Sequence, residues 1–442
     1  MNNSKTRDNN TILEVLKDNL CTGCGTCVSL CPENAINMKM RDPEKNFIPS
    51  IDNKSCINCG LCLKACPGQE VDFKKLNIDV FKEEPKDCLI GNYTNCYMGY
   101  SKIHKIRCDS SSGGLVTQIL IFALENGLID GALVTKMKND STLKPIPFIA
   151  RSKKEIIDAS KSKYCPVPAN VALKEILDAP DHEKFAVVGL PCHIHAIRKA
   201  EMLNKKLLNK ISLHLGLFCH HGVSFEGTDF FINRMKINKK DIVDLSYRGD
   251  GWPGKFKVVL NDEKIEKYRF WEFFVYPSFY FFTPKRCFMC SDALNELADI
   301  SFGDAWLPEL VVEKKGISVM ISRNKKADNL IQKLEHANMV ELKMCGSNDV
   351  IKSQMPALYF KKRSLNARKR ISKLLNTPFT SDNTYLIESN IFDYLFVILI
   401  YINNYLSSFK FIQTLANLMP MIFIRGYRYI LYKFINSRNL NK

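Results

Sequence analysis

The sequence predicts an α+β or α/β protein in which a small cysteine-rich domain precedes a mixed-sheet domain and a helical C-terminal tail. Three observations lead to this prediction. Eight cysteines stand in two short runs near the N-terminus, strand and helix patterns alternate from residue 97 to about 355, and the last fifth of the chain is both apolar and basic. A length of 442 residues allows about two or three domains of roughly 150 residues each.

A cysteine pattern that occurs twice organises residues 1–75. Each run has the spacing Cys-x2-Cys-x2-Cys-x3-Cys-Pro, which is typical of bacterial ferredoxins with two [4Fe–4S] clusters. Three sulfurs of one loop reach one cluster, and the fourth sulfur points away and closes the other. We therefore assign Cys21, Cys24, Cys27 and Cys66 to cluster one, and Cys56, Cys59, Cys62 and Cys31 to cluster two.

Other interpretations of these eight cysteines are weaker. A zinc site usually needs only two cysteine pairs, and a disulfide framework belongs to a secreted chain. The N-terminal residues lack the apolar core of a signal peptide, so the 17 cysteines favour a reducing cytoplasm. Chance can produce one Cys-x2-Cys pair, but hardly two complete runs 35 residues apart.

The rest of the chain divides by pattern. Residues 76–95 are predicted to form a charged linker with its clearest boundary at 82–86. Residues 96–355 alternate between helical and strand patterns, which predicts a partly parallel sheet. The expected helices are 12–17, 113–126, 194–204 and 225–235, and the expected strands are 35–38, 47–51, 129–135, 184–189 and 211–219.

The tail, residues 356–442, carries much of the net charge of +17. From residue 352 onward there are 14 basic and 3 acidic side chains, a net +11. No nucleic-acid motif accompanies this charge, so we expect no nucleic-acid partner. A basic and apolar tail fits an anionic membrane surface, which would place a cytoplasmic protein at the inner face of the membrane. A helical cap on the body and a partner-docking helix are the alternatives.

Four cysteines outside the first domain stand in suggestive places, and two of them lie at predicted strand ends, where sites in α/β folds assemble. Cys192 follows one strand, Cys219 ends another, and Cys287 and Cys290 form a Cys-x2-Cys pair. Three separate segments can thus surround one more [4Fe–4S] cluster. Spacing alone leaves zinc binding and thiol exchange open.

An ordered series of motifs now identifies a resemblance. The chain resembles the coenzyme F420 hydrogenase/dehydrogenase beta-subunit family, in the form that carries an N-terminal two-cluster ferredoxin module. The motifs that carry the resemblance are 110–117 (SSSGGLVT), 162–164 (SKY), 189–193 (GLPCH), 218–223 (FCHHGV), 248–252 (RGDGW), 286–290 (RCFMC) and 298–306 (ADISFGDAW).

The resemblance implies an iron–sulfur flavoprotein with a mixed-sheet FAD-binding domain. By position it makes Cys192, Cys219, Cys287 and Cys290 the ligands of a third [4Fe–4S] cluster beside the flavin. Family members act on coenzyme F420, a plant relative reduces 7-hydroxymethyl chlorophyll a, and bacterial relatives occur among functions of polysaccharide assembly.

A small-residue loop at 110–114 is the candidate flavin site. Two glycines let the backbone approach a pyrophosphate, and the N-terminus of the following helix favours an anion. An ordinary serine helix cap is the competing interpretation. The candidate cofactor-binding residues are Ser111, Ser112, Gly113, Gly114, Thr117 and Lys163.

Histidines mark the departures from the family pattern. The family often has Gln after the Pro-Cys pair, whereas this chain has His193, which is our candidate proton donor. A hydrolase that pairs Cys192 with a neighbouring histidine is improbable, because adjacent residues rarely present a nucleophile and its base to each other.

The sequence therefore predicts an FAD-dependent iron–sulfur oxidoreductase. Electrons would pass from a donor protein, such as ferredoxin or a hydrogenase/dehydrogenase subunit, through three clusters to FAD. The small-molecule acceptor would be coenzyme F420 or a polysaccharide-pathway substrate. The alternative is a non-catalytic electron-relay subunit that docks on a separate catalytic partner.

Overall fold

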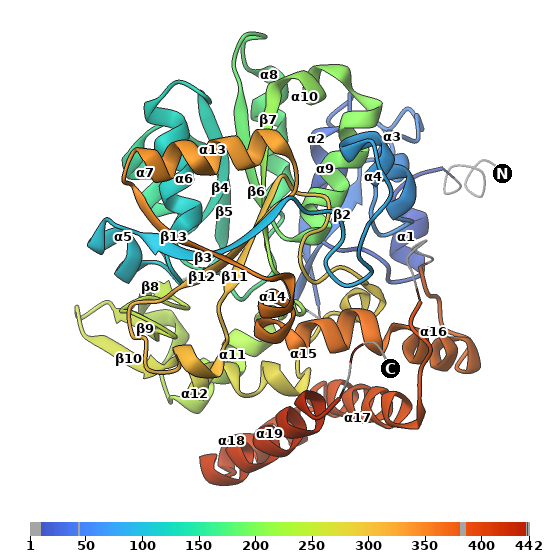
Figure 1. The fold of residues 1–442 in the computed structure, drawn as a ribbon. Helices are drawn as coiled ribbons and strands as arrows, with labels where there is room; N and C mark the ends of the chain where they lie inside the picture. Colours follow the sequence, from blue (N-terminus) through green and yellow to red (C-terminus); the bar gives the residue numbers. More distant parts are fainter. Residues whose placement is uncertain are drawn as a thin grey trace, which may run out of the picture.

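An eight-stranded mixed sheet forms the centre of the molecule in the computed structural model, which describes residues 10–442 except 43–44, 139, 141, 381–385, 439 and 441–442 (Figure 1). The strands β4, β6, β7 and β11 run parallel to their neighbours within this group, and the other pairs are antiparallel. The predicted mixed sheet is confirmed. In spatial order the strands are β13 (Val340–Cys345), β3 (Asn95–Ser101), β12 (Ser318–Ser322), β11 (Ile300–Asp304), β7 (Ile211–Leu217), β6 (Phe185–Gly189), β4 (Gly131–Met137) and β5 (Pro145–Ala150).

Helices cover both faces of this sheet, because the buried strands are apolar on both sides. Ala132 and Val134 of β4 pack in one core with α6 and α13, whereas Leu133 faces the opposite core with α8 and α9. The covering helices are α5 (His104–Asp109), α6 (Leu115–Glu125), α7 (Lys153–Asp158), α8 (Leu173–Asp178), α9 (Pro191–Leu203), α10 (Lys205–Lys210) and α13 (Lys325–His336).

The cysteine-rich domain packs beside α9 as a small, separate layer (Figure 1). Its strands form one antiparallel pair, as predicted. Gly25 and Gly60 precede its two short cysteine-bearing helices with φ of 88° and 76°, a left-handed conformation that suits glycine. The elements are α1 (Leu13–Lys17), α2 (Thr26–Ser29), β1 (Ile36–Arg41), β2 (Asn46–Ile51) and α3 (Leu61–Lys64).

The predicted linker at 76–95 is not a loose connection. The helix α4 (Phe73–Phe81) occupies its first part and caps itself with the Asp72 carboxylate. Leu89 and Ile90 are buried in the main core. The charged residues that indicated a linker lie on the outer side of a packed segment, so the prediction was wrong about packing.

A second, three-stranded sheet lies at the edge of the main domain and was not predicted. Its strands are short and polar on one face, which weakens their sequence signal. The elements here are α11 (Phe225–Arg234), η2 (Lys239–Asp241), β8 (Ile242–Ser246), β9 (Lys255–Leu260), β10 (Ile265–Arg269), α12 (Phe270–Phe274), η3 (Pro277–Phe279) and η5 (Pro308–Leu310).

The helical C-terminal part begins inside the body. Tyr359 and Phe360 are fully buried in the main core, so a tail that starts at residue 356 is corrected: its first segment packs as core. Only the later helices project from the lower end of the molecule (Figure 1). The elements are α14 (Ser347–Ser353), α15 (Met355–Leu358), the π-helical turn η6 (Tyr359–Arg363), α16 (Leu365–Leu374), α17 (Ile391–Ser407), α18 (Lys410–Leu418) and α19 (Met421–Asn436).

A buried ion pair fixes α17 to this core. The Arg363 guanidinium lies 3.0 Å from the Asp393 carboxylate, which also accepts a hydrogen bond of 2.7 Å from Tyr359. Replacement Asp393→Ala leaves a buried arginine unpaired, and we expect it to lower the free energy of unfolding by about 3–5 kcal/mol. Thermal unfolding under anaerobic conditions measures this loss. The same change at exposed Glu388 serves as the control and should leave the midpoint unchanged.

Candidate functional site

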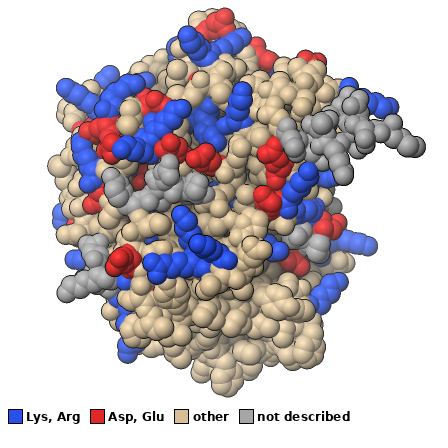
Figure 2. Space-filling view, turned by 90° about the vertical axis from the view of Figure 1, so that its right-hand side faces the viewer, with Lys and Arg blue, Asp and Glu red and all other residues tan. Residues whose placement is uncertain are grey.

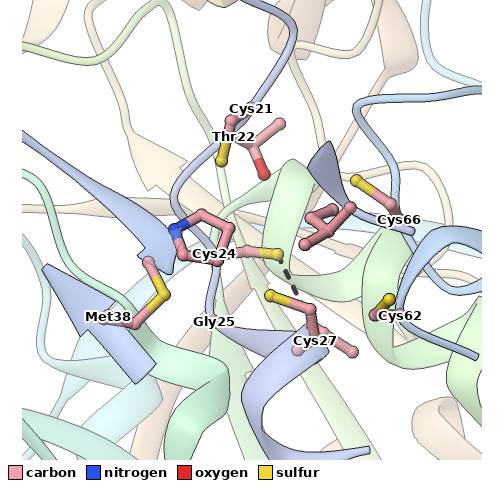
Figure 3. Close-up of a pocket in the computed structure, with 11 residues that line it drawn as sticks. Cys21, Thr22, Cys24, Gly25, Cys27, Met38, Cys62 and Cys66 are labelled. Carbon is pink, nitrogen blue, oxygen red and sulfur yellow. Dashed lines mark hydrogen bonds between the residues drawn. The ribbon is translucent and has the colours of Figure 1, made fainter. Parts of the chain in front are cut away.

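The eight N-terminal cysteines form two groups around two cavities. Figure 3 shows the first cavity, where the sulfurs come from both runs of the sequence. The second cavity also takes one sulfur from the other run. The grouping is the one that the spacing predicts, while metal ligation itself stays a prediction. Cys21, Cys24, Cys27 and Cys66 line the first cavity with Cys62 at its wall, and Cys31, Cys56, Cys59 and Cys62 line the second.

Two thiols of the first cavity, those of Cys21 and Cys66, are buried and accept hydrogen bonds from backbone amides. Burial raises the pKa of Cys21 to about 12 and that of Cys66 to about 11, so neither thiol ionises readily without a positive partner. Backbone amides point at the sulfurs: Gly23 donates to Cys21 at 3.4 Å and Gly68 donates to Cys66 at 3.3 Å. Such N–H groups stabilise thiolates bound to metal.

The four later cysteines also converge. Cys192 begins α9 directly after β6, and Cys219 follows β7, so both lie at the carboxyl ends of adjacent parallel strands. Cys287 lies in η4 (Lys285–Met289) and Cys290 follows it. Burial raises the pKa of Cys192 well above its ordinary value, and the charges of the other three thiolates raise it further. The structure thus brings three distant segments to one place.

The spacing within these groups is wider than a single ion needs. Across the residues that the structure describes, no three His, Cys, Asp or Glu side chains gather tightly enough to hold one metal ion. In a four-iron cube each ligand binds a different corner.

Lys361 is a site residue that the sequence analysis missed. It lies in η6, is 1% exposed, and hydrogen-bonds to Cys290. Burial alone would lower the pKa of Lys361, but the thiolates of Cys290, Cys219 and Cys287 raise it above its ordinary value. The ammonium therefore supplies a fixed positive charge to the second set of cysteines. Lys361 belongs to a run of basic residues, and in a sequence such a run predicts an exposed surface.

The cysteine-rich domain contacts the main domain through the loops of its first cavity. Asn170 donates its amide to the Cys24 carbonyl at 2.9 Å, and its side chain donates to the carbonyl of His193 at 3.0 Å. The charge of Cys24 also acts on Cys192. The first cavity is thus adjacent to the third group of cysteines.

Arg286 occupies the junction between these two sites. Its guanidinium is 6% exposed and donates to the Pro67 carbonyl, next to Cys66, at 3.0 Å. Nε and Nη1 have no hydrogen-bond partner within the described part of the chain. Because Cys287 is its neighbour in sequence, Arg286 places a buried cation between the two groups of sulfurs.

The serine–glycine loop lies at the start of α6, as predicted. Gly114 adopts φ of 77°, and a side chain at Gly113 would lie 2.4 Å from the Gly99 carbonyl, so only glycine fits. Ser112 donates to the Ile317 carbonyl at 2.9 Å, and Ser111 accepts from the Ser162 amide at 2.7 Å. These hydroxyls hold the loop, while the first amides of α6 have no acceptor within the helix.

Lys163 and Thr117 lie around the same loop. The Lys163 ammonium donates to the carbonyls of residues 159, 160 and 161, and burial lowers its pKa to about 7. Thr117 is buried on α6. Both therefore support the geometry of the loop in this structure.

His193 is held as a structural residue. Its Nδ1 accepts a hydrogen bond from the Leu190 amide at 3.2 Å, and its Nε2 lies 3.0 Å from the Val167 carbonyl, to which it donates. Burial lowers the pKa of His193 to about 4, so the ring is neutral. With both ring nitrogens hydrogen-bonded, His193 positions the start of α9 and thereby Cys192, and its role as a proton donor stays a prediction.

All three tryptophans of the chain gather at one place. Trp252 and Trp306 have ring centroids 4.6 Å apart, and Trp271 lies 5.4 Å from Trp306. Arg248 and Trp252 both donate to Asp304, at 2.8 Å in each case. Arg248 also contacts the hydroxyl of Tyr164, so this aromatic cluster joins the segment that carries Lys163.

Comparisons with known proteins extend this description. Residues 96–174 and 182–347 match the N-terminal and C-terminal models of the coenzyme F420 hydrogenase/dehydrogenase beta subunit, and together they cover more than half of the chain. The chain belongs to this beta-subunit family. Residues 20–70 match the 4Fe-4S dicluster domain, so this member of an oxidoreductase-related family carries an iron–sulfur domain.

Relatives cover most of the chain. An uncharacterized protein of Methanocaldococcus jannaschii is 30% identical over 72% of this chain and 88% of its own length. The coenzyme F420 hydrogenase subunit beta of Methanothermobacter thermautotrophicus is 27% identical over 58% of this chain and 86% of its own. The coenzyme F420-dependent sulfite reductase of M. jannaschii is 26% identical over 74% of this chain, which spans only 48% of that enzyme.

A solved structure shares the fold. A chain of the F420-reducing [NiFe] hydrogenase complex from Methanosarcina barkeri matches with a TM-score of 0.51 and 21% identity, over 66% of this chain and 97% of that chain. At this identity the match concerns the fold alone. It agrees with the mixed sheet and the helical C-terminal part described above.

Proposed function

We propose that the protein transfers electrons along three [4Fe–4S] clusters to a flavin. The observation that supports this proposal is the arrangement of twelve cysteines in three groups of four, with Cys24 of the first group acting electrostatically on Cys192 of the third. Family membership and the iron–sulfur domain support the same chemistry. Cys62 lines both cavities, and the sequence spacing assigns it to the second cluster and Cys66 to the first.

The order of the clusters follows from exposure. Cys59 of the second cavity is exposed, and the neighbouring Ile57 is 61% exposed, so an electron-donor protein can approach there. The first cavity lies against the main domain, and the third group lies within it. Electrons from ferredoxin or a hydrogenase/dehydrogenase subunit would enter at Cys59 and move inward to Cys192.

FAD is the proposed cofactor at the serine–glycine loop. The fit depends on the tight turn at Gly113 and Gly114 and on the amides that begin α6, which suit a pyrophosphate. Ser111 would orient the group, while Ser112 and Lys163, which donate to carbonyls of the chain, would hold the loop, and buried Thr117 would support α6. A bound flavin converts single electrons into two-electron transfer.

The proposed acceptor is coenzyme F420 or a polysaccharide-pathway substrate. The proposed location is the cytoplasmic face of a membrane, which the protein would contact through its C-terminal helices.

A relay subunit without its own acceptor is the second candidate. It is favoured by the relatives that are named as the beta subunit of coenzyme F420 hydrogenase and by the matched structure, which is a hydrogenase complex. In that case the third cluster would pass electrons to a partner protein.

Flavin content and turnover distinguish these two functions. For the anaerobically purified chain we expect about 12 Fe, from three four-iron clusters, together with one FAD per chain. After dithionite reduction, coenzyme F420 or another small acceptor should reoxidise the flavin without a partner. Iron–sulfur absorbance without flavin would exclude the enzyme proposal, and reduced flavin that needs a partner protein would support the relay.

Cys287→Ser tests the third cluster. We expect this variant to lose about four of the irons, because one ligand of a single [4Fe–4S] cluster is removed, and to keep the two ferredoxin-type clusters. Iron quantitation and low-temperature EPR spectroscopy measure the loss. Cys345→Ser, which changes a partly buried cysteine outside the three groups, is the matched control and should keep all the iron. Equal iron in both variants would contradict the assignment.

Lys361→Met tests the charge at the third cluster. A buried cation stabilises the reduced, more negative cluster, so its removal should lower the midpoint potential of that cluster by on the order of 60 mV, which corresponds to about 1.4 kcal/mol for one electron. An EPR-monitored redox titration measures the shift. Exposed Lys352→Met is the control. A potential that stays the same in both variants would show that Lys361 does not act on the cluster.

A further inference from the structure

The three C-terminal helices expose an unusually large apolar surface, which we name the C-terminal face. It consists of the outward side chains of α17, α18 and α19. Phe411, Leu418 and Ile422 are each more than 70% exposed. Figure 2 shows few charged side chains on the viewer's side of the lower end of the molecule, where Figure 1 places these helices. The large exposed apolar residues are Ile391, Phe392, Leu395, Ile398, Ile402, Tyr405, Phe409, Phe411, Leu415, Leu418, Met419, Ile422, Phe423, Tyr429, Ile430 and Tyr432.

The helix α17 is apolar on two sides. Phe396, Val397 and Ile400 are buried against the body, as expected for a surface helix. A surface helix of a globular domain normally has a polar outer side. Here the outer side carries Leu395 and Ile398, which are 53% and 47% exposed. The second apolar side has no partner within the described residues of the chain.

The other two helices are fixed in place, so the exposure is not the result of a detached tail. Arg234 donates to the carbonyls of residues 416, 417 and 419 at the end of α18. Tyr276 also donates to the Ala416 carbonyl. On α19 the Arg428 guanidinium lies 3.6 Å from the centre of the Trp271 ring. The body therefore holds both helices with their apolar side chains outward.

All the charged residues that follow Asp393 in the sequence are basic. After Asp393 the sequence contains six basic residues and no acidic one. Lys410, Arg425 and Lys433 are exposed on α18 and α19, interleaved with the apolar side chains. Long cationic side chains can bury their stems in an apolar layer and extend their charge to an anionic headgroup. Lysine is depleted in the centre of protein–protein interfaces, so this mixture favours lipid over a protein partner.

The lengths of these helices fit a location at the interface between a lipid bilayer and water. None of the helices in the described ranges is by itself long and apolar enough to cross a membrane, and only α17 and α18 together pass that test, with a bend of 98° between them. A lipid-facing helix that does not cross lies in the plane of the interface with its apolar side among the acyl chains. Exposed tyrosines such as Tyr405 and Tyr429 suit the headgroup level.

We propose that the C-terminal face binds the surface of an anionic lipid bilayer, with α17, α18 and α19 lying in the interface. Apolar burial and the attraction of Lys410, Arg425 and Lys433 to anionic headgroups act together, which is the combination that stable peripheral binding requires. This proposal says which surface would hold the protein at the membrane location given under the proposed function, and it rests on that proposed function. Its physical basis is independent of the clusters.

Vesicle co-sedimentation of the full, iron-loaded chain tests the proposal. We expect binding to vesicles of phosphatidylcholine with phosphatidylglycerol, and much weaker binding to phosphatidylcholine alone. Arg425→Gln with Lys433→Gln should weaken binding to the anionic vesicles roughly 25-fold, about fivefold for each cation. Leu418→Ser with Ile422→Ser should abolish it. Val312→Ser, which removes an 82% exposed apolar side chain elsewhere, is the matched control and should bind as the parent does.

The same experiment also tests the other candidate occupants of the C-terminal face. A chain that ignores vesicles but forms a dimer, which Leu418→Ser with Ile422→Ser converts to monomer, would replace the lipid by a second copy. A monomer that ignores both kinds of vesicle would also overturn the proposal. Iron content is measured on the same samples, so a failure of the cluster assignment is seen separately from a failure of membrane binding.

Discussion

The burial of four neighbouring thiols in one place is the constraint on which this structure depends. Cys192 and Cys219 lie at the ends of two parallel strands, where burial raises the pKa of each thiol. Four such groups can ionise together only beside strong positive charge. The fold provides part of it through Lys361, which η6 turns inward, and iron would supply the remainder. A π-helical turn is uncommon and often marks a functional position. Here it carries Lys361, whose ammonium interacts with three of the four thiols.

How much the sequence can predict depends on how local the determining interactions are. The grouping of Cys21 with Cys66 follows from spacing, because the ligands of each cavity come from two short loops. The parallel strands β4 and β6 are also visible, since each contains a continuous apolar run, and β7 is visible from its alternating leucines. By contrast, β3 pairs with β12 and β13, more than two hundred residues later, and local pattern contains no such information. Lys361 stands seventy-one residues after Cys290 in a basic run, and only the packing of η6 turns it inward.

His193 shows that a chemically suggestive residue can also have a structural role. Its position after Cys192 in sequence made it a candidate acid, but helix geometry places its ring against the start of α9. There Nδ1 accepts from Leu190 and Nε2 donates to Val167, so the imidazole replaces backbone partners that a helix start lacks. Through Asn170 the same residue is tied to the loop of Cys24. The histidine therefore contributes to the distance between two groups of sulfurs, on which the proposed electron transfer would depend.

The C-terminal face and the third group of cysteines are linked through the segment that contains η4. Asn404 of α17 donates to the carbonyls of Tyr280 and Thr283, which precede η4, and Tyr401 packs on Phe288 within it at 5.2 Å between ring centroids. The same short segment thus holds Cys287 on one side and α17 on the other. A bilayer bound to α17 would restrain η4 and with it two of the four sulfurs. Because Arg428 of α19 covers Trp271, the aromatic cluster that extends toward Lys163 lies at the same end of the molecule. An acceptor carried at a lipid surface would therefore reach the proposed flavin from the membrane side, while the exposed Cys59 belongs to the separate N-terminal layer where the proposed donor would enter.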